Sequence, residues 1–99
     1  MRYAVTGFTG DTSQATDEKI ANVRSELERR GAEVFGVGRD SYAGIDAFVV
    51  RFVIDAESDA EAERSAKQAI EDILGPGYGW GVSNIQPVRE GMGPNPFDH

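Results

Sequence analysis

The chain has 99 residues, of which 39% are hydrophobic, so it can bury one core but not two. Acidic residues outnumber basic residues by 17 to 10, and the net charge of -7 disfavours binding to nucleic acids or membrane surfaces. The absence of cysteine excludes disulfides, thiolate nucleophiles and cysteine-based zinc sites. No signal-like segment opens the chain and no apolar stretch approaches the roughly 20 residues that cross a bilayer, so we expect a cytoplasmic protein.

The first predicted elements are a strand and a helix. Arg2 to Thr9 is rich in β-branched and aromatic residues, which favours a strand. Thr16 precedes two acidic residues, as a helix N-cap does, and Gly31 is placed to end the helix. The apolar face of this helix is formed by Ile20, Val23 and Leu27.

Two further strands are predicted in the middle of the chain. Ala32 to Val37 indicates a short second strand, and Arg39 to Asp46 is expected to connect it to the third. The third strand, Ala47 to Ala56, alternates regularly between two faces. The face expected to form the core carries Phe48, Val50, Phe52 and Ile54. The opposite face carries Ala47, Val49, Arg51, Val53 and Asp55.

A second helix and a fourth strand complete the pattern. Ser58 and Glu61 form a capping-box pattern ahead of an alanine-rich apolar face, and Gly75 with Pro76 ends the helix. Val82 to Val88 predicts the fourth strand. It should lie at a sheet edge, because Pro87 cannot donate a hydrogen bond to a central strand pair.

The order strand, helix, strand, strand, helix, strand is typical of an α+β protein. It predicts a ferredoxin-like βαββαβ plait, with a four-stranded antiparallel sheet and two helices on one face. The domain should span residues 1–90, and the glycine- and proline-rich residues 91–99 should form a flexible C-terminal tail.

One segment carries a resemblance at the level of the fold. The run from Phe48 to Glu63, FVVRFVIDAESDAEAE, resembles the strand, acidic corner and alanine-rich helix of small ferredoxin-like proteins from actinobacteria and their phages. The resemblance implies a plait and an origin in a phage or another mobile element. It supplies no functional residues.

Two segments match known ligand-binding loops only in part. Gly7-Phe8-Thr9-Gly10 lacks the third glycine of a dinucleotide-binding loop, since position 13 is Ser13, and it lacks the basic surroundings of a KH clamp loop. We interpret it as a turn.

An EF-hand is excluded because Ala60 replaces the required glycine in the acidic run that follows the third strand. That run is either a solvated helix start or a weak site for a cation or basic partner, and comprises Asp55, Glu57, Asp59, Glu61 and Glu63.

The segment from Gly75 to Gly81 joins Tyr78 and Trp80 in a glycine-rich loop. Such aromatic residues can anchor a partner, because they bury a large area with few rotamers to immobilise. They can equally fold back and cap the core, with the glycines permitting the path. Both interpretations stay open at this point.

Catalysis and RNA binding have little support. The one histidine, His99, is the last residue, and no nucleophile or metal-ligand pattern stands out, so we expect no enzyme activity, no cofactor and no metal. An RNA-binding plait stacks bases on sheet aromatics, but the opposite face of the third strand has none.

The leading hypothesis is therefore a non-enzymatic protein-interaction or regulatory module. Val49, Arg51 and Val53, joined by Ala4 and Phe8 of the first strand, should form an exposed apolar patch through which two copies pair as a homodimer, or which binds another protein. The alternative is a regulatory domain that binds a small ligand between helix ends and loops, with the glycine-rich loop carrying Tyr78 and Trp80 as a lid.

Overall fold

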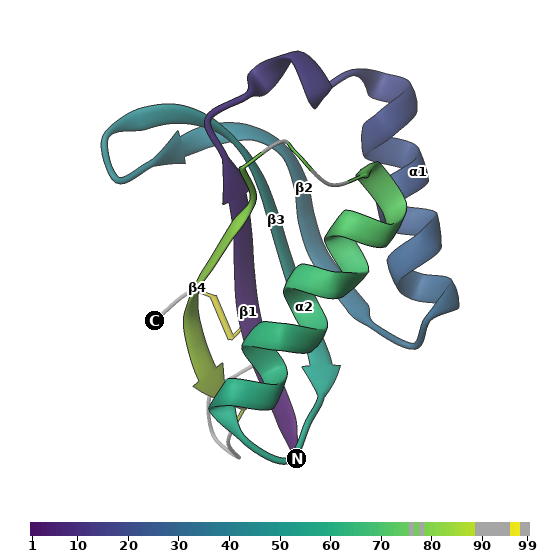
Figure 1. Cartoon of the computed structure of the whole chain (residues 1–99), viewed down its shortest axis with the longest axis vertical. Helices are drawn as coiled ribbons and strands as arrows, with labels where there is room; N and C mark the ends of the chain where they lie inside the picture. The colour runs from purple at the N-terminus through teal and green to yellow at the C-terminus, as the bar shows by residue number, and fades with distance from the viewer. Residues whose placement is uncertain (76, 78, 89–95, 98–99) are drawn as a thin grey trace.

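A computed structural model describes residues 1–75, 77, 79–88 and 96–97 of the chain. The elements are β1 (Arg2–Thr9), the short 3-10 helix η1 (Thr12–Gln14), α1 (Asp17–Arg29), β2 (Glu33–Tyr42), β3 (Ile45–Asp55), α2 (Asp59–Leu74) and β4 (Gly81–Pro87). Figure 1 shows the α+β arrangement, in which the strands form a four-stranded antiparallel sheet in the order β2-β3-β1-β4. This arrangement is consistent with a ferredoxin-like fold.

Both predicted helix starts are confirmed. The Thr16 hydroxyl accepts a hydrogen bond from the backbone N–H of Lys19, and the Ser58 hydroxyl accepts one from Glu61. Each cap satisfies a backbone donor that the first helical turn leaves without a partner. Acidic residues fill the first turn of each helix, where they complement the helix dipole.

The main core lies between the helices and one face of the sheet. Phe48 and Phe52 of β3 are fully buried there, and the ring of Trp80 packs edge-on against Phe48 at 5.2 Å. A Cβ atom at Gly7 would come within 2.4 Å of the Ile70 side chain, so the glycine allows α2 to lie close on β1. Both Gly7 and Thr9 lie within β1, which spans Arg2–Thr9. The predicted turn at this motif is therefore wrong for these residues.

The β2–β3 connection differs from the prediction. Both strands are longer than expected, and only Ala43 and Gly44 separate them, with φ of 53° and 82°. Two positive φ values suit the tight turn of a twisted hairpin, which the sequence does not signal with the usual Asn-Gly pair. At the end of the hairpin, Tyr42 stacks on Phe8 of β1 with ring centroids 4.6 Å apart. Most of the predicted connecting loop is thus an extension of the sheet.

The position of β4 at a sheet edge is confirmed, since it pairs with β1 alone among the described strands.

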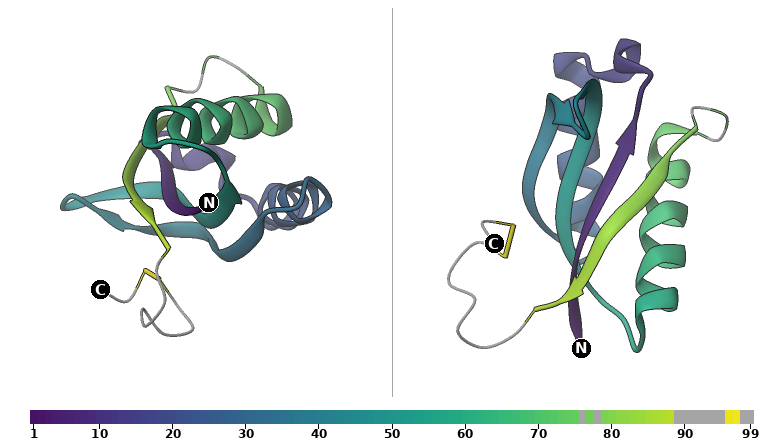
Figure 2. Two further views of the ribbon diagram at one scale, coloured as in Figure 1. Left: turned by 90° about the horizontal axis from the view of Figure 1, so that it is seen from below. Right: turned by 90° about the vertical axis from the view of Figure 1, so that its left-hand side faces the viewer.

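Of the predicted flexible tail, only Pro96 and Phe97 fall within the described residues. Pro96 is buried and Phe97 partly buried, and Figure 2 shows this segment on the opposite side of the sheet from α2. No helix in the described part of the chain is long and apolar enough to cross a bilayer.

Candidate functional site

The open face of the sheet, defined here as the face turned away from α1 and α2, has a polar row across its middle. Gly36 of β2 pairs with Arg51 of β3, Arg51 pairs with Thr6 of β1, and Thr6 pairs with Ser83 of β4. Residues paired directly across strands share a face, so these four positions form one line. We call this line the central polar row, since Arg51, Thr6 and Ser83 are polar. Further polar residues on the same face are Glu33, Asp40 and Gln86, which pair with Val53, Ala47 and Ala4.

The predicted exposure of the apolar patch is wrong. Val49 and Val53 are each only 2% exposed, and Ala4 is fully buried. The physical reason is that other segments lie on the open face: Tyr42 of the hairpin stacks on Phe8, and the Phe97 ring packs beside Phe35 at 5.5 Å. The open face is therefore covered within a single copy of the chain.

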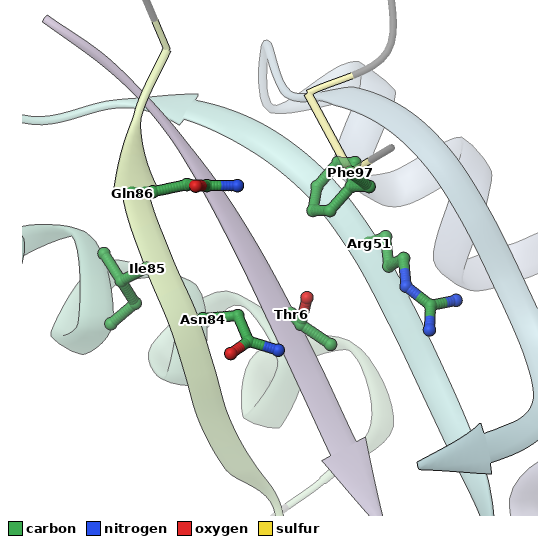
Figure 3. A pocket seen from close by; sticks show the side chains of 6 residues that line it. All are labelled: Thr6, Arg51, Asn84, Ile85, Gln86 and Phe97. Atoms are coloured by element: carbon green, nitrogen blue, oxygen red, sulfur yellow. The ribbon is translucent and has the colours of Figure 1, made fainter. Parts of the chain in front are cut away.

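Bulges in both edge strands flank the central polar row. The register of β4 shifts between the partners of Ala4 and Thr6, where Asn84 has a φ of 52°, and the register of β2 shifts next to Gly36. A bulge re-aims side chains, and bulges are frequent beside binding sites. Figure 3 shows the result: Asn84 and Gln86 point across β1, while Ile85 points to the other side of β4.

A cavity of about 370 Å³ lies over this part of the sheet. Its lining residues come from β1, β3, β4 and the C-terminal segment, and are Thr6, Arg51, Asn84, Ile85, Gln86 and Phe97. A smaller hollow of about 200 Å³ lies on the β2 side, bordered by Gly36, Gly38, Asp40 and Arg51 among others. Arg51 therefore stands between two spaces, and its side chain lines both.

Thr6 is the unusual member of the cavity. As a whole residue it is 2% exposed, and it lines the cavity. In Figure 3 the hydroxyl points toward the side of the cavity on which Phe97 lies. In the described part of the chain, the side-chain polar atom that is buried without a hydrogen bond is Trp80 Nε1 and not the Thr6 hydroxyl, so Thr6 presents its hydroxyl to the cavity.

Arg51 supplies the positive charge of the site. Its Nη1 atom donates to the Asp40 carboxylate over 3.1 Å, and its side chain is 31% exposed. The pKa of Asp40 lies below its usual value, first because the backbone N–H of Ser41 donates to the carboxylate and then because Arg51 does. The carboxylate thus stays ionised and compensates part of the Arg51 charge.

The side-chain amides of Asn84 and Gln86 present their oxygen atoms as hydrogen-bond acceptors. Gln86 Nε2 donates to the backbone oxygen of Pro96 over 3.1 Å, and Asn84 Nδ2 donates to the Tyr42 hydroxyl over 3.2 Å. These bonds fix the amino groups and leave Gln86 Oε1 and Asn84 Oδ1 without a hydrogen bond to the described residues. The β4 side of the cavity therefore offers acceptors, and the β3 side offers the donors of Arg51.

The residues predicted from sequence have different outcomes. Arg51 lies on the open face as expected and lines the cavity. Trp80 is 5% exposed and packs into the core, in agreement with the core-capping interpretation. Tyr78 lies outside the described residues. In the acidic run, Asp59 and Glu61 belong to the first turn of α2.

Several cavity residues were not predicted from sequence. Thr6 occupies the position between Ala4 and Phe8 on the same strand face, so the alternation of β1 could have identified it. Gln86 and Phe97 carried no comparable signal, because their positions depend on the β4 bulge and on the docking of the C-terminal segment.

The chain matches no protein-family model, no curated protein and no solved structure. Among the described residues, no three His, Cys, Asp or Glu side chains gather closely enough to hold a metal ion. The function has to be inferred from the geometry of the open face itself.

Proposed function

We propose that the chain is a non-enzymatic regulatory module that binds a small polar ligand in the cavity of the open face. The observation that carries this proposal is the cavity of about 370 Å³, which polar side chains from three strands line together: Thr6 of β1, Arg51 of β3, and Asn84 and Gln86 of β4. These side chains offer both hydrogen-bond donors and acceptors to a ligand.

The size and composition of the cavity support a small ligand. A volume of about 370 Å³ lies within the usual range for such sites, roughly 300–1,000 Å³. The walls combine hydrogen-bond donors, acceptors and the Phe97 ring, which together can fix the orientation of a ligand. Among the described residues, the side chains that line the cavity include no histidine, carboxylate or lysine.

We also infer a ferredoxin-like plait as the scaffold. The order of the elements along the chain supports this assignment, as does the antiparallel sheet with β1 and β3 in its centre. We place the protein in the cytoplasm, since a chain without cysteine suits a reducing compartment.

The experiment is a titration with small neutral, anionic, cationic and zwitterionic probes, followed by ¹⁵N–¹H NMR spectra. We expect at least one probe to shift the amide resonances of Thr6, Arg51 and Gln86 together, and the shifts to shrink in Thr6→Val. The cavity of about 320 Å³ near Leu27 and Ala69 serves as an internal control. Shifts confined to that second cavity, or no shifts at all, would contradict the proposal.

A protein partner is the second candidate, favoured by the end of the β2–β3 hairpin. Ile45 is 57% exposed there, and in the described part of the chain the only other exposed large apolar side chain is Met1. The free edge of β2 lies beside it and could pair with a strand of a second copy. Light scattering across a concentration series tests this: self-association that is lost in Ile45→Asp would support it.

A further inference from the structure

We infer that the ligand of the open-face cavity is an uncharged, hydroxyl-rich molecule of the size of a monosaccharide. This inference rests on the proposed function and names the chemical class of its ligand. It is drawn from the charges around the cavity, from the neutral polar groups that face it and from its aromatic wall.

The charges around the cavity favour a ligand without a charge. Arg51 is the one charged residue among the described lining residues, and its Nη1 atom donates to the Asp40 carboxylate over 3.1 Å. Figure 3 shows its guanidinium turned away from Gln86 and β4. An anion would therefore meet a guanidinium that is already paired, and a cation would meet no carboxylate among the described lining residues. Either ion would lose hydration without gaining an opposite charge.

Neutral polar groups form the wall on the β1 and β4 side. In Figure 3 the amides of Asn84 and Gln86 reach from β4 across β1, on which Thr6 lies. The amide oxygens accept hydrogen bonds, and the Thr6 hydroxyl can both donate and accept. A carboxylate cannot donate to the amide oxygens, and an ammonium group cannot accept from the hydroxyl. A ligand hydroxyl does both, so a hydroxyl-rich ligand can pair with every group of this wall.

Contacts with the rest of the fold hold the two amides in place. Asn84 Nδ2 donates to the Tyr42 hydroxyl over 3.2 Å, and the same hydroxyl is hydrogen-bonded to the Ser83 hydroxyl. Gln86 Nε2 donates to the backbone oxygen of Pro96 over 3.1 Å. An amide with a tied nitrogen also has a fixed oxygen. The acceptors are therefore in position before a ligand arrives, which lowers the entropy cost of binding.

Phe97 supplies an aromatic wall. Its ring lines the cavity and packs beside Phe35, with the ring centroids 5.5 Å apart. The negative face of an aromatic ring attracts weakly positive C–H groups, such as those of a sugar ring. Ile85 is the other apolar lining residue, but its side chain points to the opposite side of β4 in Figure 3. The described walls thus suit a ring with one apolar face and polar edges better than a flat aromatic ligand, which stacks on both faces.

The test uses matched sugars that differ in charge. Glucose, galactose and mannose are the neutral probes, each is compared with its uronate and its 2-amino sugar, and uracil is the flat neutral probe. Binding is measured by ¹⁵N–¹H NMR titration of the full chain. We expect at least one neutral sugar to shift the resonances of Thr6, Arg51 and Gln86 together. It should bind at least about tenfold more tightly than its two charged derivatives, because a charged group would lose hydration without a partner.

Ionic strength provides a second readout. The affinity for the neutral sugar should stay the same when sodium chloride is raised from about 0.02 to 0.5 M, since no ion pair with the ligand is screened. A marked loss of affinity at high salt would contradict an uncharged ligand.

Two threonine variants provide a matched pair on β1. Thr6 and Thr9 are each 2% exposed, but Thr6 pairs with Arg51 on the open face and Thr9 pairs with Phe48 on the helix-covered face. Thr6→Val should weaken sugar binding at least about tenfold, because it removes a hydrogen-bonding group of the cavity. Thr9→Val should leave binding unchanged, since the Thr9 hydroxyl accepts from the backbone N–H of Asp11 over 3.2 Å and does not line the cavity. Equal losses in both variants would overturn the inference.

The remaining outcomes separate the two claims. If a uronate, an amino sugar or uracil shifts the same resonances as strongly as every neutral sugar, the ligand class is wrong and the ligand site stands. If no probe shifts these resonances in the wild type, the sugar-like ligand and the proposed function both fail.

Discussion

The two faces of the sheet are buried to a similar extent, but they are built from different groups. On the helix-covered face, Phe48 and Phe52 are fully buried in an apolar core. On the open face, Val49 and Val53 are 2% exposed, yet a polar row and a cavity of about 370 Å³ lie between them and β4. The comparison shows that burial alone does not identify a core. For a face that is covered but keeps polar side chains around a cavity, we propose binding.

The largest expected effect is on the helix-covered face. Phe52→Ala should reduce the free energy of unfolding by about 3–5 kcal/mol, because it leaves a large cavity in the core. Val53→Ala should cost about 1–2 kcal/mol, since it removes two buried methyl groups. Urea denaturation measures both. A greater loss in Val53→Ala would mean that the open face, and not the helix-covered face, carries the main stability.

Val49→Asp sharpens the comparison on the open face. The side chain is 2% exposed within one copy of the chain, so the new carboxyl group would be buried without a partner. We expect a loss of about 2–4 kcal/mol in the free energy of unfolding. If the variant instead keeps its stability and only changes oligomeric state in light scattering, the predicted homodimer through this face would be supported.

Phe97→Ala tests whether the C-terminal segment belongs to the open face. The partly buried ring packs beside Phe35, and Gln86 holds the adjacent Pro96, so we expect a loss of about 1–2 kcal/mol. The exposed Ile45→Ala is the control and should stay within about 0.5 kcal/mol. An effect of Phe97→Ala no larger than that of the control would restore the sequence-based prediction of a free tail.

Asp40→Asn should have a smaller effect that depends on pH. Because the pKa of Asp40 is lowered in the folded chain, its ion pair stabilises the fold above the ordinary pKa of about 3.9 and is lost as pH falls through the lowered value. The urea midpoint of the variant should therefore lie below that of the wild type at pH 6, and the difference should vanish at pH 2.5. A difference that persists at pH 2.5 would have another cause.

The same variant bears on ligand binding. Removing the carboxylate frees the Arg51 guanidinium, so a small anionic probe should bind about two- to fivefold more tightly at neutral pH. NMR titration at fixed ionic strength measures this change. Weaker binding would show that Asp40 helps to hold the ligand and does not compete with it.

Sequence patterns predicted the helix-covered face well and the open face poorly. The period-two pattern of β3 and the caps at Thr16 and Ser58 depend on local spacing, which sequence displays directly. The burial of Val53 and the direction of Gln86 depend on long-range packing and on a bulge beside Asn84. No local pattern encodes either of these, so the site could not be predicted.

The central claim is that the polar row of the open face is kept for binding and not for stability. Thr6→Val tests it most directly, because valine has nearly the shape of threonine and removes only the hydroxyl that lines the cavity. The account predicts that the free energy of unfolding in urea changes by less than about 0.5 kcal/mol without a ligand. A fall of about 1 kcal/mol or more would contradict it, since the hydroxyl would then be a structural group with a partner in the fold.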